Sequence, residues 1–558
     1  MRVEQAGISR GAAFDFRFEG RAVTGYAGES IAAALISAGE AGLRETAGGG
    51  RRGVFCGMGE CGECMVLADG VPVRGCMTGV RPGMDVQPAP ARAVAHAEPQ
   101  VAAQVELFPD LLVIGAGPAG LAAASAAAAA GLDGLGVDER GQAGGQYFKQ
   151  PGKGFGIERR RLDAQFAEGA ALAESAVLAG AEFRFGTSVW AAALVDGALC
   201  IDLSAAGSTQ RVRPKRLVIA TGAYERPMAF PGWTLPGVMT TGAAQTLLRA
   251  YQTSPGKRVL VAGNGPLNLQ VAQELVRSGV EVVAVVESAA APGPRHAGQI
   301  LQMVATAPGL VADGVRHVAA LRLAGVRMLH GQVVAEARGE GRVDEVVLSG
   351  GQRFAVDALC LGYGFVPQAE IARALGVREG VRDGDGRSSI ADVFIAGDGG
   401  GLGGARVALA QGLLAGAAAA ADLGWPVPPA EIARARRDLV RHRRFQDALW
   451  QLYAPVVPAP RPTAETVICR CESVTAGVVE GHLGAGMGDL GSIKRMCRVG
   501  MGRCQGRYCS VLVADVLAAH GHVPDEPGFA PRPPFKPVTI GAVAGNSANN
   551  RSTSAQVS

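Results

Sequence analysis

The sequence predicts an α/β core of two dinucleotide-binding units, with a small cysteine-bearing domain at each end of the chain. The core is indicated by a pattern of buried strand, glycine-rich turn and apolar helix that begins near Leu107 and begins again at Lys257. The flanking domains are indicated by the cysteines, because eight of the eleven fall into two clusters, one near each terminus. These observations predict several domains joined in one chain.

The composition excludes several classes of protein. With 558 residues, 48% hydrophobic and 19% charged, the chain can bury large cores, so disorder throughout is excluded. A net charge of +4 is close to neutral for this length and does not indicate a nucleic-acid partner. Residues Met1–Gly20 lack the pattern of a signal peptide, and the apolar stretch Gly403–Trp425 is interrupted by Arg406 and Gln411. We therefore expect a buried helix there, no integral membrane span and a cytoplasmic protein, with attachment to the inner membrane through a partner left open.

The pattern along the chain divides it into seven segments. Turn-rich and proline-rich stretches separate the periodic regions, and the last stretch is rich in Pro, Ser and Asn. The predicted segments are a cysteine-bearing domain at 1–90, a linker at 91–106, the first part of a nucleotide-binding domain at 107–256, a second nucleotide-binding domain at 257–350, the second part of the first domain at 351–425, a helical and cysteine-bearing region at 426–522, and a disordered tail at 523–558.

The first cysteine cluster comprises Cys56, Cys61, Cys64 and Cys76 in the spacing C-x4-C-x2-C-x11-C. Its first three members match the spacing of plant-type [2Fe–2S] sites, and the intervening glycines let the backbone wrap around thiolates. Structural zinc is the alternative, although zinc sites usually use two closely spaced pairs. We predict a [2Fe–2S] cluster. The stretch from Val54 to Gly59 resembles the small ferredoxin-like subunit of the hydrogen cyanide synthase and hydroxyproline dehydrogenase group, which implies a β-grasp fold.

The first dinucleotide-binding motif follows the apolar strand Leu111–Ile114. Gly115 permits a tight turn, Gly117 admits a pyrophosphate, and Gly120 lets helix and strand pack. The N-terminus of the helix faces the phosphates. Asp138 or Glu139, at the end of the next strand, would hold the ribose hydroxyls, and the residue count favours Asp138. The candidate binding residues of the motif are Gly115, Gly117, Pro118, Ala119 and Gly120.

Three later segments, which contain Gly145–Gln146, Thr221–Gly222 and Gly397–Asp398, favour FAD as the ligand of this motif. They resemble the motifs of flavoproteins with two dinucleotide-binding domains of the disulfide-reductase type, whose second flavin motif implies that Asp398 binds the ribityl chain. The corresponding candidate residues are Gly145, Gln146, Thr221, Gly222, Gly397 and Asp398. The same fold class serves many reductases, so it does not define a substrate.

The second dinucleotide-binding motif contains Gly263 and Gly265, but Asn268 stands at its third glycine position. We expect this side chain to crowd the contact between helix and strand, which puts productive use of NAD(P) in doubt. NAD(P), another adenine nucleotide and a structural relic without a ligand remain alternatives for this unit.

The second cysteine cluster comprises Cys469, Cys471, Cys504 and Cys509 in the spacing C-x-C-x32-C-x4-C. Thiolate ligands suit iron–sulfur clusters or zinc, and we favour a second [2Fe–2S] cluster, with zinc and a remnant without metal as alternatives. The segment resembles bacterioferritin-associated ferredoxin and, with the motif Gly500-Met501-Gly502, the alpha subunit of heterotetrameric sarcosine oxidase. Cys200, Cys360 and Cys497 are expected to be ordinary core residues.

The stretches Thr221–Pro227 and Phe230–Val238 resemble the alpha-type flavoprotein subunit of hydrogen cyanide synthase and of opine and hydroxyproline dehydrogenases, here with the ferredoxin-like subunit fused in front. The resemblance implies that a separate beta-type FAD-dependent subunit oxidises a C–N bond of an amino acid, opine or secondary amine. Electrons would pass to this chain and then to an external acceptor. Because a flavin accepts two electrons and a [2Fe–2S] cluster carries one, we expect a flavin between two clusters.

Two other functions remain open from the sequence. One is a self-contained NAD(P)H-dependent flavin and iron–sulfur reductase, and the other is a non-enzymatic iron–sulfur scaffold. No catalytic residue for amine oxidation can be named in this chain, because the resemblance implies that the amine-binding site lies in the partner subunit.

Overall fold

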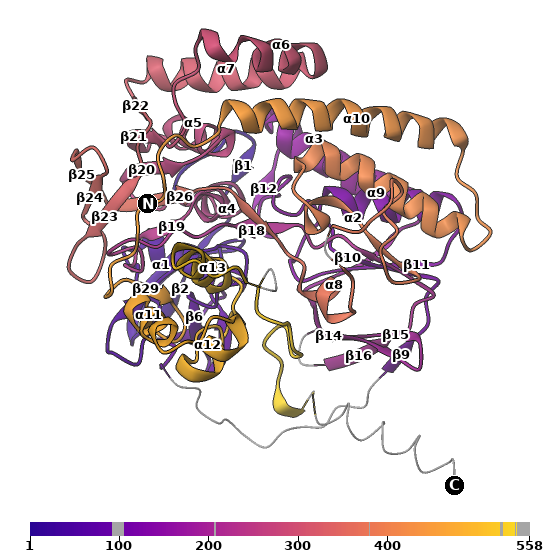
Figure 1. The fold of residues 1–558 in the computed structure, drawn as a ribbon, viewed down its shortest axis with the longest axis horizontal. Helices are drawn as coiled ribbons and strands as arrows, with labels where there is room; N and C mark the ends of the chain where they lie inside the picture. Colours follow the sequence, from indigo (N-terminus) through magenta and orange to yellow (C-terminus); the bar gives the residue numbers. More distant parts are fainter. Residues whose placement is uncertain (92–104, 206–207, 379, 525–527, 542, 544–558) are drawn as a thin grey trace.

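In a computed structural model, which describes residues 1–91, 105–205, 208–378, 380–524, 528–541 and 543, two five-stranded parallel sheets form the centre of the molecule (Figure 1). The N-terminal domain and the C-terminal helices lie side by side on one flank of this centre, although they come from opposite ends of the sequence. The remaining short strands β1 and β12, β4 and β5, and β18 and β27 pair antiparallel; they span Ile8–Ser9, Gly156–Ile157, Arg44–Glu45, Arg51–Arg52, Ala223–Glu225 and Phe365–Pro367.

The first nucleotide-binding domain has the strand order β13-β11-β10-β17-β28, all parallel. Apolar helices cover one face of the sheet, and a smaller sheet of order β14-β15-β16-β9 packs on the other face. The strands of the main sheet are β10 (Leu111–Ile114), β11 (Gly134–Asp138), β13 (Glu182–Phe185), β17 (Arg216–Ile219) and β28 (Val393–Ile395). The other elements are β9 (Val105–Leu107), β14 (Thr187–Val195), β15 (Ala198–Ala205), β16 (Ser208–Val212), α2 (Pro118–Ala129), α3 (Ala164–Leu178), α8 (Glu370–Ala374) and α9 (Gly404–Ala421).

Helix α9 is the predicted buried helix. Gly412 and Gly416 lie against the backbone of α2, where an added Cβ would stand 2.0 Å from the Ala119 oxygen and 2.2 Å from the Ala123 oxygen. Among the described residues, α9 is the one helix long and apolar enough to cross a membrane, and 67% of it is buried inside the protein. Such burial is typical of a core helix.

The second nucleotide-binding domain repeats the parallel arrangement in the order β19-β26-β20-β21-β22. A three-stranded antiparallel meander precedes the return to the sheet. The parallel sheet consists of β19 (Val238–Thr240), β20 (Arg258–Gly263), β21 (Glu281–Glu287), β22 (Arg327–His330) and β26 (Ala358–Gly362). The meander consists of β23 (Val334–Arg338), β24 (Glu345–Leu348) and β25 (Arg353–Ala355). The helices of this domain are α4 (Thr241–Tyr251), α5 (Pro266–Arg277), α6 (Ala297–Thr306) and α7 (Pro308–Leu323). The long helix α10 (Pro429–Leu452) packs against both α6 and α9.

The N-terminal domain is a mixed sheet of order β3-β2-β8-β6-β7 with one helix. Alternating Phe16 and Phe18 on β2 are buried against Ile31 and Leu35 on that helix, whose first turn is capped by Ser30. The central pair β2 and β8 is parallel, as in the predicted β-grasp fold. Its elements are β2 (Ala13–Phe18), β3 (Arg21–Tyr26), α1 (Ile31–Ser37), β6 (Met65–Ala68), β7 (Val71–Arg74) and β8 (Asp85–Pro88).

The C-terminal domain contains β29 (Val467–Cys469), β30 (Val474–Thr475), α11 (Ala476–Gly484), α12 (Leu490–Cys497) and α13 (Cys509–Ala519). Part of the tail differs from the predicted disorder. Phe529 is 6% exposed and packs against Gly500 and Gly506, and Phe535 is 3% exposed and donates its amide to the Trp190 carbonyl at 2.8 Å. The proline-rich sequence has no periodicity, so no local pattern indicates these two anchors.

The predicted linker at 91–106 lies mostly outside the described residues. Its last part is ordered, because β9 begins at Val105 and pairs with β16.

Candidate functional site

The first four predicted cysteine ligands lie together. Cys56, Cys61, Cys64 and Cys76 are each 2–3% exposed although they come from a loop and a strand end. Backbone amides of Cys61, Glu63 and Cys76 each donate to a cysteine sulfur at 3.4 Å. The side chains meet in two pairs, Cys56 with Cys61 and Cys64 with Cys76. Burial alone would raise the pKa of the Cys56 thiol, but hydrogen bonds from Cys61 and from backbone amides lower it to about 6.

The glycines of this loop are required by its shape. Gly57, Gly59 and Gly62 all have positive φ, between 59° and 83°. At Gly57 a Cβ would also stand 2.7 Å from the Cα of Ala243, at the start of α4. The loop therefore packs closely against the second nucleotide-binding domain.

The second set of predicted ligands is also brought together. Cys469, Cys504 and Cys509 are buried, Cys471 is partly buried, and the side chains again meet in two pairs, Cys469 with Cys509 and Cys471 with Cys504. Cys497 lies apart on α12 and donates to the Ile493 carbonyl at 3.1 Å. Cys200 and Cys360 are buried in strands of the two nucleotide-binding domains.

Both cysteine sets fit a binuclear cluster. In a [2Fe–2S] cluster with four cysteine ligands, each iron takes two thiolates, so sulfurs gathered in twos match that arrangement. Within the described ranges, no group of three or more His, Cys, Asp or Glu side chains is arranged to hold a single metal ion. Amide donors at the sulfurs of the first set are the hydrogen bonds that such thiolates accept.

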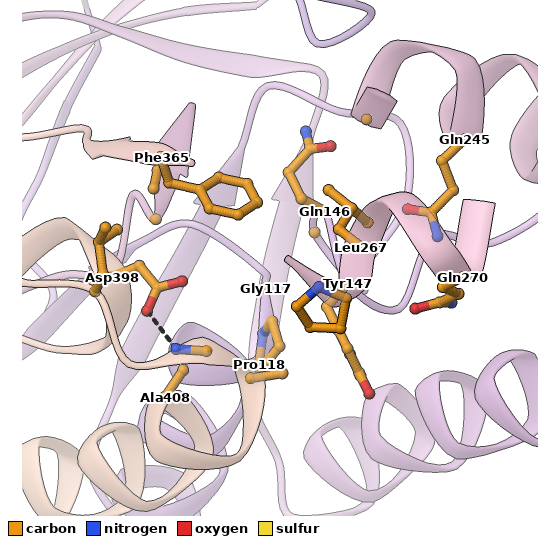
Figure 2. Close-up of a pocket in the computed structure, with 18 of the residues that line it drawn as sticks. Gly117, Pro118, Gln146, Tyr147, Gln245, Leu267, Gln270, Phe365, Asp398 and Ala408 are labelled. Carbon is orange, nitrogen blue, oxygen red and sulfur yellow. Dashed lines mark hydrogen bonds between the residues drawn. The ribbon is translucent and has the colours of Figure 1, made fainter. Parts of the chain in front are cut away.

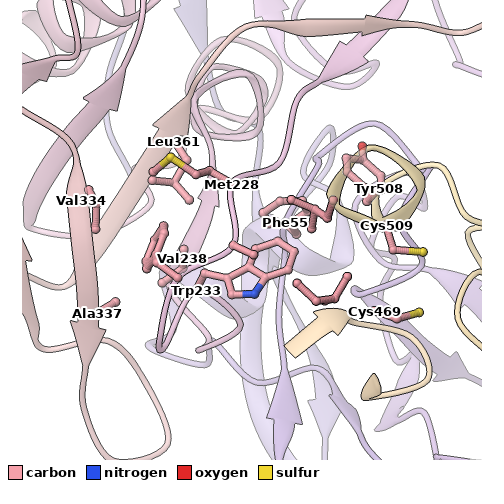
Figure 3. Packing of buried hydrophobic residues seen from close by; sticks show 14 of the residues in the cluster. Phe55, Met228, Trp233, Val238, Val334, Ala337, Leu361, Cys469, Tyr508 and Cys509 are labelled. Atoms are coloured by element: carbon pink, nitrogen blue, oxygen red, sulfur yellow. The ribbon is translucent and has the colours of Figure 1, made fainter. Parts of the chain in front are cut away.

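The two cysteine sets lie next to each other. The Sγ of Cys471 lies 3.8 Å from the carbonyl oxygen of Cys61. Phe55, which precedes Cys56, makes an edge contact with Tyr508, which precedes Cys509, at 5.4 Å between ring centroids (Figure 3). This arrangement differs from the expected one, in which a flavin separates the two clusters.

The flavin motifs line one large cavity of about 1370 Å³ between the two nucleotide-binding domains. Figure 2 shows Gly117, Pro118, Gln146, Tyr147 and Asp398 around it, with Gln245, Leu267 and Gln270 from the second domain. Predicted site residues on its wall are Gly115, Gly117, Pro118, Ala119, Asp138, Glu139, Gly145, Gln146, Thr221, Gly222, Gly265, Gly397 and Asp398. Gly120 and Gly263 lie behind the wall, where they allow close packing.

The glycine-rich loop of the first motif has the predicted geometry. Gly115 has φ of +107°, and a Cβ there would stand 2.4 Å from the Ala220 oxygen. A Cβ on Gly120 would stand 1.7 Å from the Gly115 oxygen. Helix α2 begins at Pro118 without a side-chain cap, and Gly117, Pro118 and Ala119 line the cavity, so the helix N-terminus fits a pyrophosphate.

Asp138 serves the loop itself. Its carboxylate accepts hydrogen bonds from the amides of Ala116 and Arg140, each at 2.7 Å. Burial raises the pKa of Asp138. Both Asp138 and Glu139 lie on the cavity wall, so the ribose role that the residue count gives to Asp138, with Glu139 as the alternative, stays a prediction.

Glu139 receives two cations that no sequence motif indicates. Arg74 of the N-terminal domain and Lys536 of the tail contact its two oxygens at 2.9 and 3.0 Å. Although burial opposes it, these charges hold the pKa of Glu139 well below its usual range. Lys536 also pairs with Glu60, beside Cys61. Nothing in the local sequence connects these residues, because they meet only through the domain arrangement.

Asp398 and a buried polar group complete the cavity. The Asp398 carboxylate accepts the amides of Gly403 and Gly404 at 2.8 and 3.0 Å, at the start of α9 (Figure 2). Lys149, 3% exposed, donates to the Gln245 side chain at 2.8 Å, and burial lowers its pKa to about 7. Burial raises the pKa of nearby Glu225 to about 7. Lys149 belongs to no motif, whereas Glu225 lies in the stretch Thr221–Pro227, although that resemblance does not indicate that its carboxyl lines the cavity.

Contrary to expectation, the Asn268 side chain does not crowd the contact between helix and strand in the second motif. Its side chain accepts from the Thr241 hydroxyl at 2.8 Å and donates to the Gly362 carbonyl at 3.0 Å. Glu287, at the end of β21, accepts the amides of Gly265 and Ala289 at 2.9 Å. The second loop is therefore well formed, and Gly265 faces the large cavity.

Comparison with known proteins agrees with this geometry. Residues 109–412, more than half of the chain, match the pyridine nucleotide-disulphide oxidoreductase family, and residues 11–90 match the 2Fe-2S iron-sulfur cluster binding domain. Residues 464–546 match the sarcosine oxidase A3 domain. The A subunit of opine oxidase from Agrobacterium tumefaciens is 34% identical over 80% of this chain and 93% of its own length. The chain belongs to the family of opine oxidase A subunits.

Other known proteins are also similar to this chain over most of its length. The HcnB subunit of hydrogen cyanide synthase from Pseudomonas aeruginosa is 32% identical over 77% of this chain and 97% of its own length. The alpha subunit of sarcosine oxidase from Corynebacterium sp. strain P-1 is 27% identical over 97% of this chain, which spans 57% of that relative. The crystal structure of L-proline dehydrogenase from P. horikoshii has the same fold, with a TM-score of 0.70, 22% identity, and coverage of 96% of this chain and 98% of that one.

The predicted family, fold class and cofactor types are confirmed by these comparisons. The chain is an FAD-dependent oxidoreductase subunit with a [2Fe–2S] domain. Members of the family are named as subunits, which indicates assemblies of more than one kind of chain.

Proposed function

We propose that this protein relays electrons from a flavin in the large cavity to the first cysteine set, then to the second, and on to an external acceptor. The observation that carries the proposal is the position of the first cysteine loop. Met58 and Glu60 of this loop line the flavin cavity, while the Cys61 carbonyl contacts Cys471 of the second set. A flavin supplies the exchange between paired and single electrons, and thiolate-bound iron supplies single-electron steps.

The residues around the cavity have defined tasks in this proposal. The amides at the start of α2 bind the pyrophosphate, Asp138 holds the glycine loop, and Asp398 orders the start of α9 beside the ribityl chain. Gln146, Thr221 and their neighbouring glycines position the ring system on the cavity wall. The eight cysteines hold two [2Fe–2S] clusters.

The electrons enter from a partner. We place oxidation of the C–N bond of an amino acid, opine or secondary amine in a beta-type FAD-dependent subunit. The names of the relatives, which include opine oxidase and sarcosine oxidase, support this class of substrate. A cytoplasmic location remains the prediction from the sequence.

The order of the relay is tested with the full chain. Anaerobically purified protein is expected to contain FAD and two clusters, measured as flavin, iron and acid-labile sulfide. After rapid photoreduction of the flavin, freeze-quenched samples are followed by electron paramagnetic resonance. In Cys64→Ser, the second cluster should remain oxidised on the time scale at which it is reduced in wild-type protein. In Cys509→Ser, the first cluster should still be reduced. Unimpaired reduction of the second cluster in Cys64→Ser would contradict the order.

A second function is favoured by one observation. Asn264, Gly265 and Pro266 of the second motif line the same cavity as the flavin motifs. Direct reduction by a nicotinamide nucleotide is therefore the alternative, and anaerobic addition of NADH or NADPH distinguishes the two. Rapid loss of flavin absorbance with nucleotide alone would favour the reductase, whereas an unchanged spectrum supports reduction through a partner subunit.

A further inference from the structure

A buried group of ionic side chains lies between the two cysteine sets. Glu63 stands between Cys61 and Cys64 and is 1% exposed. Its carboxylate contacts Arg44 at 2.5 Å, Arg470 at 3.1 Å and Arg52 at 3.8 Å. Because Arg470 stands between Cys469 and Cys471, these contacts join the ligand loops of both sets. We call Glu63, Arg44, Arg52 and Arg470 the arginine junction.

The arginine junction carries a net positive charge in the protein interior. Three guanidinium groups face one carboxylate, and the side chains of Arg44 and Arg470 are each only 4% exposed. Burial and the neighbouring charge of Arg470 lower the pKa of Arg52 to about 10, which leaves it protonated at neutral pH. A buried excess of charge is costly unless something nearby compensates it.

Some donors of the junction have no hydrogen-bond partner. The buried nitrogens Nε of Arg44, Nε of Arg52 and Nη2 of Arg470 donate no hydrogen bond to any residue that the structure describes. Leaving a buried charged donor without an acceptor costs about 1–3 kcal/mol or more. Stability therefore does not explain this arrangement. The guanidinium of Arg470 is instead held in place by the Phe55 and Trp233 rings, at 4.2 and 4.8 Å, and by the Trp233 carbonyl at 2.8 Å.

The missing negative charge is supplied by the thiolates and by any cluster that they hold. Arg44 also donates to the Arg470 carbonyl, between Cys469 and Cys471, at 3.3 Å. Arg503, beside Cys504, is a further and partly buried cation. Arg470 therefore places a cation between two ligands of the second set, whereas its partner Glu63 places an anion between two ligands of the first set. Net charge near a cluster is a main determinant of its reduction potential.

We propose that the arginine junction makes electron transfer from the first cluster to the second favourable, because its cations stabilise added negative charge at Cys469 and Cys471 more than at Cys61 and Cys64. This inference rests on the proposed relay. In the step, the first cluster is oxidised by one electron and the second is reduced by one. No bond breaks and no proton moves, since the guanidinium groups stay protonated.

The full-length protein tests this proposal in a dithionite titration followed by electron paramagnetic resonance, with Cys64→Ser and Cys509→Ser to assign the two signals. In wild-type protein the second cluster should be reduced first. In Arg470→Met we expect its midpoint potential to fall, so that its preference for the electron drops about tenfold or more, which is about 59 mV for a one-electron couple. In Glu63→Gln the midpoint potential of the first cluster should rise instead.

Arg211→Met is the matched control, because Arg211 is also buried and ion-paired, to Asp202 at 2.8 Å, but lies between β15 and β16. It should leave both midpoint potentials unchanged. If the first cluster is reduced before the second in wild-type protein, the inference is wrong although the relay stands. If Arg470→Met fails to retain iron, the test rests on Glu63→Gln. Unchanged midpoint potentials of both clusters in Glu63→Gln would then overturn the inference. Protein without iron would overturn the relay itself.

Discussion

The two nucleotide-binding domains use the same loop with different third residues. In the first, Gly120 lies so close to its own strand that a Cβ would stand 1.7 Å from the Gly115 oxygen. In the second, Asn268 occupies the equivalent position and bonds to Thr241 and Gly362. The neighbouring strand β26 ends in a glycine at this point, so the side chain finds room. A glycine is therefore required at the third position only where the helix packs too closely for a side chain, as it does at Gly120.

The largest expected effect comes from breaking the first loop. Gly120→Val would force the start of α2 away from Gly115, and overpacking of this kind typically costs about 1–3 kcal/mol or more. We expect flavin stoichiometry to fall several-fold below the wild-type value, measured by absorbance after anaerobic purification. Iron content should persist, because the cysteine sets lie in other domains. A variant with full flavin content would show that the close contact at Gly120 is dispensable.

The boundary between the two domains gives a pH-dependent prediction. Glu225 follows β17 of the first domain and accepts the amide of Gly242, in α4 of the second, at 2.9 Å. Burial raises the pKa of Glu225 from 4.5 to about 7. The folded protein thus keeps a proton that the unfolded chain loses above about pH 4.5, so its stabilising effect is present below that pH and is lost as pH rises toward 7.

Glu225→Gln removes this titration. Between about pH 4.5 and 7 the wild-type free energy of unfolding should fall by up to about 3 kcal/mol relative to the variant, measured by urea unfolding of flavin-free protein. Glu182→Gln is the matched control, because it makes the same change at an exposed position on β13. Parallel pH profiles of wild type and Glu225→Gln would contradict the raised pKa.

The same comparison shows what sequence can predict. Both nucleotide-binding folds and both cysteine sets follow from local patterns, because glycines and thiolates must stand at fixed spacings near one ligand. The contacts that connect the sites do not. Glu63 and Arg470 are 407 residues apart, and Lys536 reaches Glu60 over 476 residues. Their pairing depends on how whole domains pack, and the sequence near each residue resembles any charged loop.

The details that differ from expectation have similar causes. Crowding at Asn268 does not occur, because Gly362 lies opposite it, and the local sequence cannot show this contact. The ribose role of Asp138 stays a prediction, but a residue count cannot show that its carboxylate also accepts the Ala116 amide. The flavin motifs do not lie between the two cysteine sets, because order along the chain is not order in space and the C-terminal domain packs against the N-terminal one.

A smaller effect is expected at the second loop. Asn268→Ala leaves the Thr241 hydroxyl and the Gly362 carbonyl without this partner and should cost about 1–3 kcal/mol in free energy of unfolding. Flavin stoichiometry should stay within error of wild type, in contrast to Gly120→Val. Loss of flavin in Asn268→Ala would mean that the two domains depend on each other more strongly than their separate sheets indicate.

The smallest effect concerns the acid at the end of the second strand in each domain. Asp138 and Glu287 both accept backbone amides of their own glycine loops, so each is expected to stabilise its loop whether or not a nucleotide is bound. Glu287→Gln keeps one acceptor oxygen and should cost about 1 kcal/mol in stability. If Glu287 also binds a ribose, the rise in melting temperature on adding ADP-ribose to wild type should be lost in Glu287→Gln and retained in Asp138→Asn. An equal rise in all three proteins would assign Glu287 a purely structural role in the second loop.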